Sequence, residues 1–215
     1  MLHLQKLDVS CKRGISLLLN ICHCKSLTYT TSTSKAESDL LAGFSLSEDF
    51  ISQHEEQAIV TEVNPTLLRR KYNKGHWDNA IVLFRETEKS EWNEENYKIM
   101  KRFEEHVFGI KESYLPATHV LDLSEDGYIK PHIDSVKFCG PLVSGLSLLS
   151  DSVMRLRLDE ENYADVFIPR LSVYIMSKEI RYQYTHEILA NPATIHDQNI
   201  HRTRRITVMK RSKEF

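Results

Sequence analysis

The 215-residue sequence has little cysteine, glycine, proline and tryptophan, with 4, 7, 6 and 2 residues respectively. Three of the four cysteines lie within the first 36 residues, so the remainder, which has only Cys139, cannot contain a disulfide framework. With 41% hydrophobic and 27% charged residues, the composition also excludes collagen-like and largely disordered chains. The formal net charge of -2 excludes a chain that is cationic throughout in order to coat nucleic acid.

Long apolar runs and fingerprint motifs are missing as well. The run Ile15–Ile21 is too short to span a bilayer and is interrupted by Asn20, so we expect no membrane span. The sequence contains no internal repeat, no P-loop and no dinucleotide-binding glycine motif. Its length suits one domain with a short appendage, and we expect this domain to be a monomer.

The first 36 residues differ in composition from the rest. They hold five basic groups, one acidic group and many serines and threonines, whereas residues 37–215 hold 23 basic and 29 acidic groups. Such a start is typical of a transit peptide, so residues 1–36 are expected to be a disordered, removable leader that directs the protein to the mitochondrial matrix. A secretory signal is the alternative, but no small-x-small cleavage site is evident and Cys139 would have no cysteine to pair with.

Residues 37–117 have the pattern of a mainly helical cover. Ser47 is expected to cap a helix that has an acidic first turn and ends before Pro65. Asn93 is expected to cap a second helix that ends at Gly109. Between these helices, the short apolar run at residues 80–84 is compatible with a strand.

From residue 118 onward, several short segments have a period of two, so that residues i and i+2 belong to one set and the residues between them to another. A period of two predicts strands with two different faces. The clearest examples are residues 119–124, 154–158, 171–176 and 205–209, and turn signals such as the one at residues 125–127 separate them. The spacing predicts seven or eight strands, which is typical of a sandwich or jelly roll. We therefore expect one mainly β domain (α+β) at residues 37–215, in which the helical cover lies over a jelly-roll core at residues 118–215.

One candidate metal site lies in this β region. His132 and Asp134 are two residues apart and would point to the same face of a strand, and His186 follows several strands later. Two histidines and one carboxylate leave coordination positions open, an arrangement that suits Fe(II) oxygenases. A zinc hydrolase with a bound water is an alternative, as is a surface pair without any metal.

A second candidate feature is the basic last segment. Arg205, Thr207 and Arg211 would share one strand face, while Arg204 would alternate to the opposite face. Guanidinium groups bind carboxylates in a bidentate manner, so a metal site beside Arg205 and Arg211 predicts a dicarboxylate cosubstrate. A zinc hydrolase would not need this pair, although a strand with solvated charges remains the simpler alternative.

In this order, the candidate residues are similar to those of the AlkB-like Fe(II)/2-oxoglutarate dioxygenases. The runs 127–140, 145–155 and 186–189 resemble the mitochondrial AlkB homologue 7 branch of that family, and the resemblance covers about residues 40–215. It implies a double-stranded β-helix, which is a jelly-roll variant. It also implies that His132, Asp134 and His186 are the catalytic Fe(II) ligands, and that the enzyme consumes 2-oxoglutarate and O2 and releases succinate and CO2.

The resemblance further implies a 2-oxoglutarate pocket. Arg205 would hold the distal carboxylate of the cosubstrate, and Arg211 would support this contact. Tyr174 would offer its hydroxyl group, and Ile206 and Thr207 would line the pocket.

Charge and departures from the family pattern bear on the substrate. DNA-repair members have an Asn-x-Tyr pair where this sequence has Leu-Asp-Leu at residues 121–123. Residues 37–117 hold 10 basic and 16 acidic groups, and residues 118–215 hold 13 of each, whereas a nucleic-acid groove is basic. We therefore expect hydroxylation of a mitochondrial protein. N-demethylation of RNA by the same mechanism and a non-catalytic, metal-bearing regulatory module remain alternatives.

Overall fold

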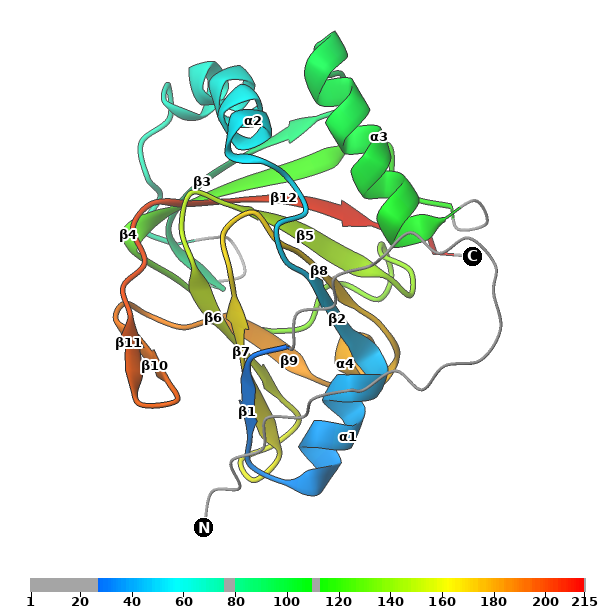
Figure 1. The fold of residues 1–215 in the computed structure, drawn as a ribbon, viewed down its shortest axis with the longest axis vertical. Coiled ribbons are helices and arrows are strands. Elements are labelled where there is room, and N and C mark those ends of the chain that lie inside the picture. The colour runs from blue at the N-terminus through cyan, green and yellow to red at the C-terminus, as the bar shows by residue number, and fades with distance from the viewer. Residues whose placement is uncertain (1–26, 76–79, 110–112, 215) are drawn as a thin grey trace, which may run out of the picture.

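A curled antiparallel sheet makes up most of the protein in the computed structural model, which describes residues 27–75, 80–109 and 113–214 (Figure 1). The strand order is β1-β7-β6-β9-β4-β12-β5-β8-β2, and β3 also pairs with β4. A separate hairpin is formed by β10 and β11. The expected mainly β architecture with a helical cover is thus confirmed.

The described residues form four helices and twelve strands. The helices are α1 (Ser34–Gly43), α2 (Gln53–Leu67), α3 (Glu94–Phe108) and α4 (Lys178–Tyr182). The strands are β1 (Tyr29–Thr31), β2 (Phe44–Ser47), β3 (Ile81–Lys89), β4 (Thr118–His132), β5 (Val143–Leu148), β6 (Ser152–Arg157), β7 (Tyr163–Ile168), β8 (Val173–Met176), β9 (Thr185–Ile188), β10 (Ala193–Ile195), β11 (Gln198–Ile200) and β12 (Arg205–Arg211).

Strand β4 connects the two halves of the sheet. Its first part pairs with β3 and β12, and its last part pairs with β9. The turn expected at residues 125–127 is wrong, because β4 continues through it. The buried guanidinium of Arg202 donates hydrogen bonds to the carbonyl groups of Ser124 and Glu125 and so satisfies the backbone of this stretch.

Alternation along the strands sends side chains into two large hydrophobic cores, and a smaller cluster lies between β6 and the β10–β11 hairpin. The inner core lies within the curl of the sheet and includes Leu121, Met154 and Tyr174. The outer core lies between the sheet and the helices and includes Ile206 and Val208. Central strands such as β12 therefore have one face toward the interior and one toward the helical cover, whereas β6 turns its outer face toward the β10–β11 hairpin.

Helices α2 and α3 pack side by side over the sheet (Figure 1). Asn93 caps α3 and Gly109 ends it, as expected. The start expected for α2 is wrong: Ser47 ends β2, and Ser52 caps the helix through a capping box with Glu55. Pro65 lies inside α2 rather than beyond it. In the described part of the chain, no helix is long and apolar enough to cross a membrane.

The N-terminal described residues belong to the folded domain. Strand β1 pairs with β7, and α1 packs against α4. The hydroxyl group of Tyr184 donates a hydrogen bond to Asp39 and ties α1 to the segment before β9. Residues 29–36, expected to belong to the leader, thus contribute a strand and the start of a helix, while residues 1–26 lie outside the described residues.

Candidate functional site

Three side chains expected to bind a metal come together at the junction of β4 and β9. One potential ligand atom from each of His132, Asp134 and His186 lies within 4.8 Å of the others. His132 and His186 are paired in register on the two strands, and their ring centroids are 4.2 Å apart. A register shift between Ile129 and His132 gives β4 one extra residue, and this bulge aligns the two histidines.

The surroundings of these side chains keep them in the forms that bind metals. His132 Nδ1 lies 2.9 Å from the carbonyl oxygen of Lys130, so Nδ1 can donate a proton there and leave Nε2 free for a metal. Burial, with the neighbouring His132, lowers the pKa of His186 to about 3 and keeps it neutral. Burial raises the pKa of Asp134, but Arg211 and the two histidines outweigh this effect and hold it well below its usual range.

Arg205 is a buried cation whose donors are not all used. Its side chain is only 1% exposed, and within the described structure its Nε and Nη2 atoms have no hydrogen-bond partner. The neighbouring Thr207 hydroxyl is also buried and without a partner there. Burial lowers the pKa of Arg205, and the neighbouring Tyr174 hydroxyl opposes this effect. Unused buried donors of this kind suit an anionic ligand.

Comparison with known proteins places the chain in a family. No protein-family model matches it. Two curated proteins named alpha-ketoglutarate-dependent dioxygenase alkB homolog 7, mitochondrial, from Bos taurus and Mus musculus, are each 45% identical over 166 residues, or 76% of this chain and 75% of theirs. The chain belongs to the AlkB-like family of 2-oxoglutarate-dependent dioxygenases.

Solved structures agree with the fold of this AlkB-like dioxygenase. The structure of OsALKBH1 is 14% identical, with a TM-score of 0.58 over 79% of this chain and 97% of that one. A Pseudomonas putida prolyl-4-hydroxylase is 12% identical, with a TM-score of 0.56 over 84% of this chain and 98% of that one. At such low identities the likeness concerns the fold alone, and it confirms the expected jelly roll.

Membership in the AlkB-like family implies Fe(II), 2-oxoglutarate and O2, and the residues present fit these groups. Two imidazoles and one carboxylate are a donor set that Fe(II) accepts with positions left open. The unused nitrogens of Arg205 match the two oxygens of a carboxylate. Burial raises the pKa of the Tyr174 hydroxyl, and the charges of Arg205, Asp134 and Arg211 also act on it.

The alternation of β12 divides the residues expected to form the cosubstrate pocket. Arg205 and Thr207 lie on the inner face with Tyr174, whereas Ile206 packs in the outer core. The side chain of Ile206 therefore points away from the pocket that it was expected to line, because successive strand residues face opposite sides. Arg204 also lies on the outer side, as expected, where its guanidinium bonds to Asp122.

Arg211 contacts a candidate metal ligand, whereas the resemblance implies that it supports the contact of Arg205 with the cosubstrate. Its Nη2 atom lies 3.2 Å from Asp134 Oδ1, in an ion pair that is largely buried. This pair fixes one carboxylate oxygen and leaves the other for a metal. The sequence predicts the arginine but not this partner, since Asp134 is far from it along the chain.

Gly145 makes room for the Tyr174 side chain. The two residues are register partners on β5 and β8, and a Cβ atom on Gly145 would lie 2.5 Å from the Tyr174 hydroxyl oxygen. Any larger side chain would displace the ring from its place beside Arg205. The glycine is thus required for close approach within the pocket.

Arg181 of α4 is a positioning residue that the sequence does not reveal. Its buried guanidinium donates to four carbonyl groups of the loop that follows β4, with distances of 3.0 Å to Asp134, 3.3 Å to Ser135, 2.9 Å to Cys139 and 3.1 Å to Gly140. The backbone of a candidate metal ligand is thereby tied to the helix that precedes His186. No local pattern signals the role, because the acceptors are backbone atoms from a distant segment.

Replacing Arg181 with methionine is expected to lower the affinity for Fe(II) by about 10- to 100-fold, the usual effect of losing a group that orients a metal ligand. The buried carbonyl groups would lose their donors and the Asp134 backbone would be free to shift. Calorimetric titration with Mn(II) measures the effect. Arg155→Met, which breaks the ion pair of Arg155 with Asp165 on β6 and β7, is the control, and equal losses in both variants would contradict the positioning role.

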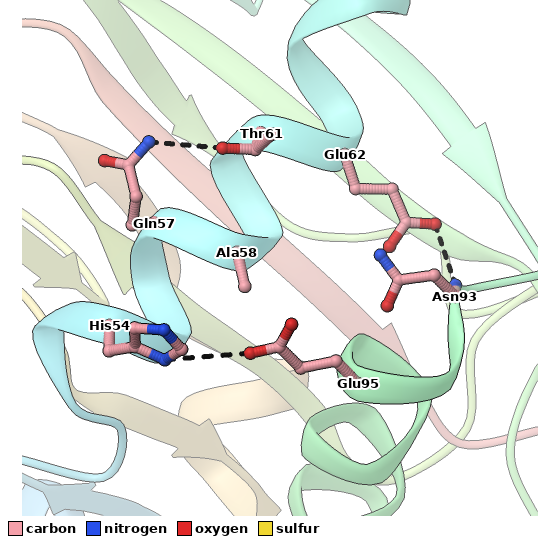
Figure 2. Close-up of a pocket in the computed structure, with 7 residues that line it drawn as sticks. All are labelled: His54, Gln57, Ala58, Thr61, Glu62, Asn93 and Glu95. Atoms are coloured by element: carbon pink, nitrogen blue, oxygen red, sulfur yellow. Dashed lines mark hydrogen bonds and ion pairs between the residues drawn. The ribbon is translucent and has the colours of Figure 1, made fainter.

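A groove between α2 and α3 is separate from this site (Figure 2). It has a volume of about 320 Å³ and is lined by His54, Gln57, Ala58, Thr61, Glu62, Asn93 and Glu95. The exposed imidazole of His54 lies 3.6 Å from Glu95, Gln57 donates a hydrogen bond to Thr61, and the Asn93 amide donates to Glu62. None of the candidate metal or cosubstrate residues borders it, so the groove is not the catalytic pocket.

Proposed function

We propose that this chain is an Fe(II)- and 2-oxoglutarate-dependent dioxygenase in which His132, Asp134 and His186 hold the iron. The observation that carries the proposal is the convergence of their ligand atoms within 4.8 Å, next to a buried arginine with unused donors. When bound, Fe(II) with 2-oxoglutarate and O2 supplies the oxidation of a substrate C–H bond and yields succinate and CO2. The protein residues bind and orient these groups.

Each residue of the site has a distinct role in this proposal. Arg205 and Tyr174 bind the distal carboxylate of 2-oxoglutarate, with the Thr207 hydroxyl as a further donor. Arg211 orients Asp134 and keeps it ionised. The Lys130 carbonyl fixes the tautomer of His132, so that its Nε2 atom faces the metal.

The proposed substrate is a protein. The basic cluster at residues 202–205 would be the natural phosphate track, but its arginines are engaged inside the domain. Arg202 donates to backbone carbonyl groups of β4, Arg204 binds Asp122, and Arg205 is buried in the candidate pocket. Little of this positive charge is available to the backbone of a nucleic acid.

The proposed location is the mitochondrial matrix. The Bos taurus and Mus musculus relatives are named mitochondrial, and the start of this chain has the composition of a transit peptide. Because β1 pairs with β7, we propose that the leader ends before Tyr29 rather than at residue 36. N-terminal sequencing of the protein recovered from mitochondria tests this; a first residue beyond Tyr29 or an intact Met1 would contradict it.

The test of the enzymatic proposal is succinate production by the purified protein with Fe(II), ascorbate and 2-oxoglutarate. We expect succinate release above that of a His132→Ala variant, and a further increase when a protein substrate is present. Absence of any difference from this variant at verified iron occupancy would refute the proposal. Stimulation by methylated RNA without stimulation by mitochondrial peptides would refute the protein substrate alone.

A further inference from the structure

Two buried hydroxyl groups lie opposite each other on the inner face of the sheet. Ser147 on β5 and Thr207 on β12 are register partners and are 0% and 1% exposed. Within the described structure, neither hydroxyl oxygen has a hydrogen-bond partner. A buried hydroxyl group without a partner is costly, so two of them in one place indicate a site for a polar ligand. Thr207 belongs to the proposed cosubstrate pocket, whereas Ser147 has no role in it so far.

The backbone of Ser147 brings its side chain close to that of Thr207. Its amide donates to the Ser172 carbonyl and its carbonyl accepts from the Leu171 amide, so both groups face away from β12. Toward β12, Ser147 and Thr207 therefore form a non-hydrogen-bonded pair, in which the Cα atoms are about 4.5 Å apart and the side chains are closest. Both side chains point inward, because the residues on either side of each pack in the outer core.

The same face holds the groups that are proposed to bind the distal carboxylate. Arg205 lies two residues before Thr207 on β12. Gly145 lies two residues before Ser147 on β5, and the Tyr174 hydroxyl lies over it, since a Cβ atom there would be 2.5 Å from that oxygen. Residues two apart on a strand are separated by roughly 7 Å. The hydroxyl groups of Ser147, Thr207 and Tyr174 and the guanidinium of Arg205 therefore belong to one small area of the inner face.

We propose that Ser147 is a further 2-oxoglutarate-binding residue, whose hydroxyl donates a hydrogen bond to the distal carboxylate beside Thr207 and Arg205. This inference rests on the proposed function and adds a residue to its pocket. A carboxylate accepts several hydrogen bonds through its two oxygens, so both hydroxyl groups and the guanidinium can bind it together. A cosubstrate with an uncharged distal end would leave these buried donors unpaired, and Ser147 thus contributes to the selection of a dicarboxylate.

The experiment is calorimetric titration of 2-oxoglutarate into the full chain loaded with Mn(II), without O2. Wild type, Ser147→Ala and Ser144→Ala are compared, and thermal unfolding of the same proteins is measured without metal or cosubstrate. Ser144 is the matched control. It lies on the same strand and is also 0% exposed, but its hydroxyl donates to the Lys210 carbonyl on the opposite face.

We expect Ser147→Ala to bind 2-oxoglutarate at least about tenfold more weakly than wild type, the usual effect of losing one hydrogen bond to a charged group. This variant should unfold at the wild-type temperature or above it, because it removes a hydroxyl group that has no partner in the described structure. Ser144→Ala should bind within about twofold of wild type and unfold at a lower temperature, because it loses a buried hydrogen bond.

Binding by Ser147→Ala within about twofold of wild type would overturn the proposal, as would equally weakened binding in both variants. A fall in the unfolding temperature of Ser147→Ala as large as that of Ser144→Ala would also overturn it, because the hydroxyl would then have a partner within the protein. If wild type binds no 2-oxoglutarate, the proposed function fails together with this inference. If wild type binds it and only the behaviour expected of Ser147→Ala is not observed, the proposed function stands.

Discussion

Replacing Arg205 with methionine is expected to raise the KM for 2-oxoglutarate by at least about 100-fold, the effect of losing a bidentate charge-assisted contact in a buried site. The same change should leave the protein without cosubstrate as stable as wild type or more so. Arg205 is buried with two unused donors, and a buried, poorly paired cation is replaced by an apolar side chain of similar length at little or no cost. Succinate release against 2-oxoglutarate concentration, together with thermal unfolding, measures both effects.

The matched control is the adjacent arginine. Arg204→Met removes bonds to Asp122, a carboxylate that is 0% exposed and also bound by Arg85. This variant should lose roughly 2–3 kcal/mol of stability, because a buried carboxylate loses one of its two guanidinium partners, and should keep its KM. Arg205→Met is thus expected to raise the KM without loss of stability, and Arg204→Met to lower the stability without a change in KM. A wild-type KM in Arg205→Met, or an equal rise in Arg204→Met, would contradict the assignment of the pocket.

Replacing Asp134 with alanine should reduce the affinity for Fe(II) by more than about 100-fold, because it removes the only anionic ligand of the proposed set. It should also lower the stability of the metal-free protein by about 2 kcal/mol, since Arg211 is left largely buried without its carboxylate. Mn(II) titration and urea unfolding with a chelator measure the two effects separately.

The double variant Asp134→Ala/Arg211→Met tests the cause of the instability. It should regain most of the lost stability, because it removes the unpaired charge, but it should still fail to bind the metal. If the double variant is no more stable than Asp134→Ala, the ion pair is not the origin of the loss. Wild-type metal affinity in either variant would refute the proposed ligand set.

Rules that relate neighbouring residues, such as strand alternation, predict the parts of the site that lie within one strand. The spacing of His132 and Asp134 places both on one side of the strand end, and the alternation of β12 separates Arg205 from Arg204. The same rule contradicts the expected pocket position of Ile206, which came from a family resemblance and not from the period of the strand. Applied consistently, strand alternation would have excluded this side chain from the sequence alone.

Contacts between distant segments could not be predicted. Arg181 and Arg202 bind backbone carbonyl groups that lie far from them along the chain, and any residue type could supply such acceptors. Arg202 also explains the wrong turn at residues 125–127: it satisfies the backbone of β4 where the local sequence favours a turn. The start of α2 was missed although it has a local signal, because Ser52 and Glu55 have the spacing of a capping box, whereas Ser47 belongs to β2, which pairs with β8.

The place of β12 in the sheet has a consequence for how the molecule folds. This strand comes last in chain order among the described strands, yet it lies between β4 and β5 at the centre of the sheet. The pairing of β12 with β4 and β5 and the placement of Arg205 therefore cannot occur before the final segment is available. These pairings close long loops. Chains that lack this segment would expose two unpaired inner strand edges, which are sites of association between chains. Strand β12 thus both completes the candidate site and covers the strand edges through which chains could aggregate.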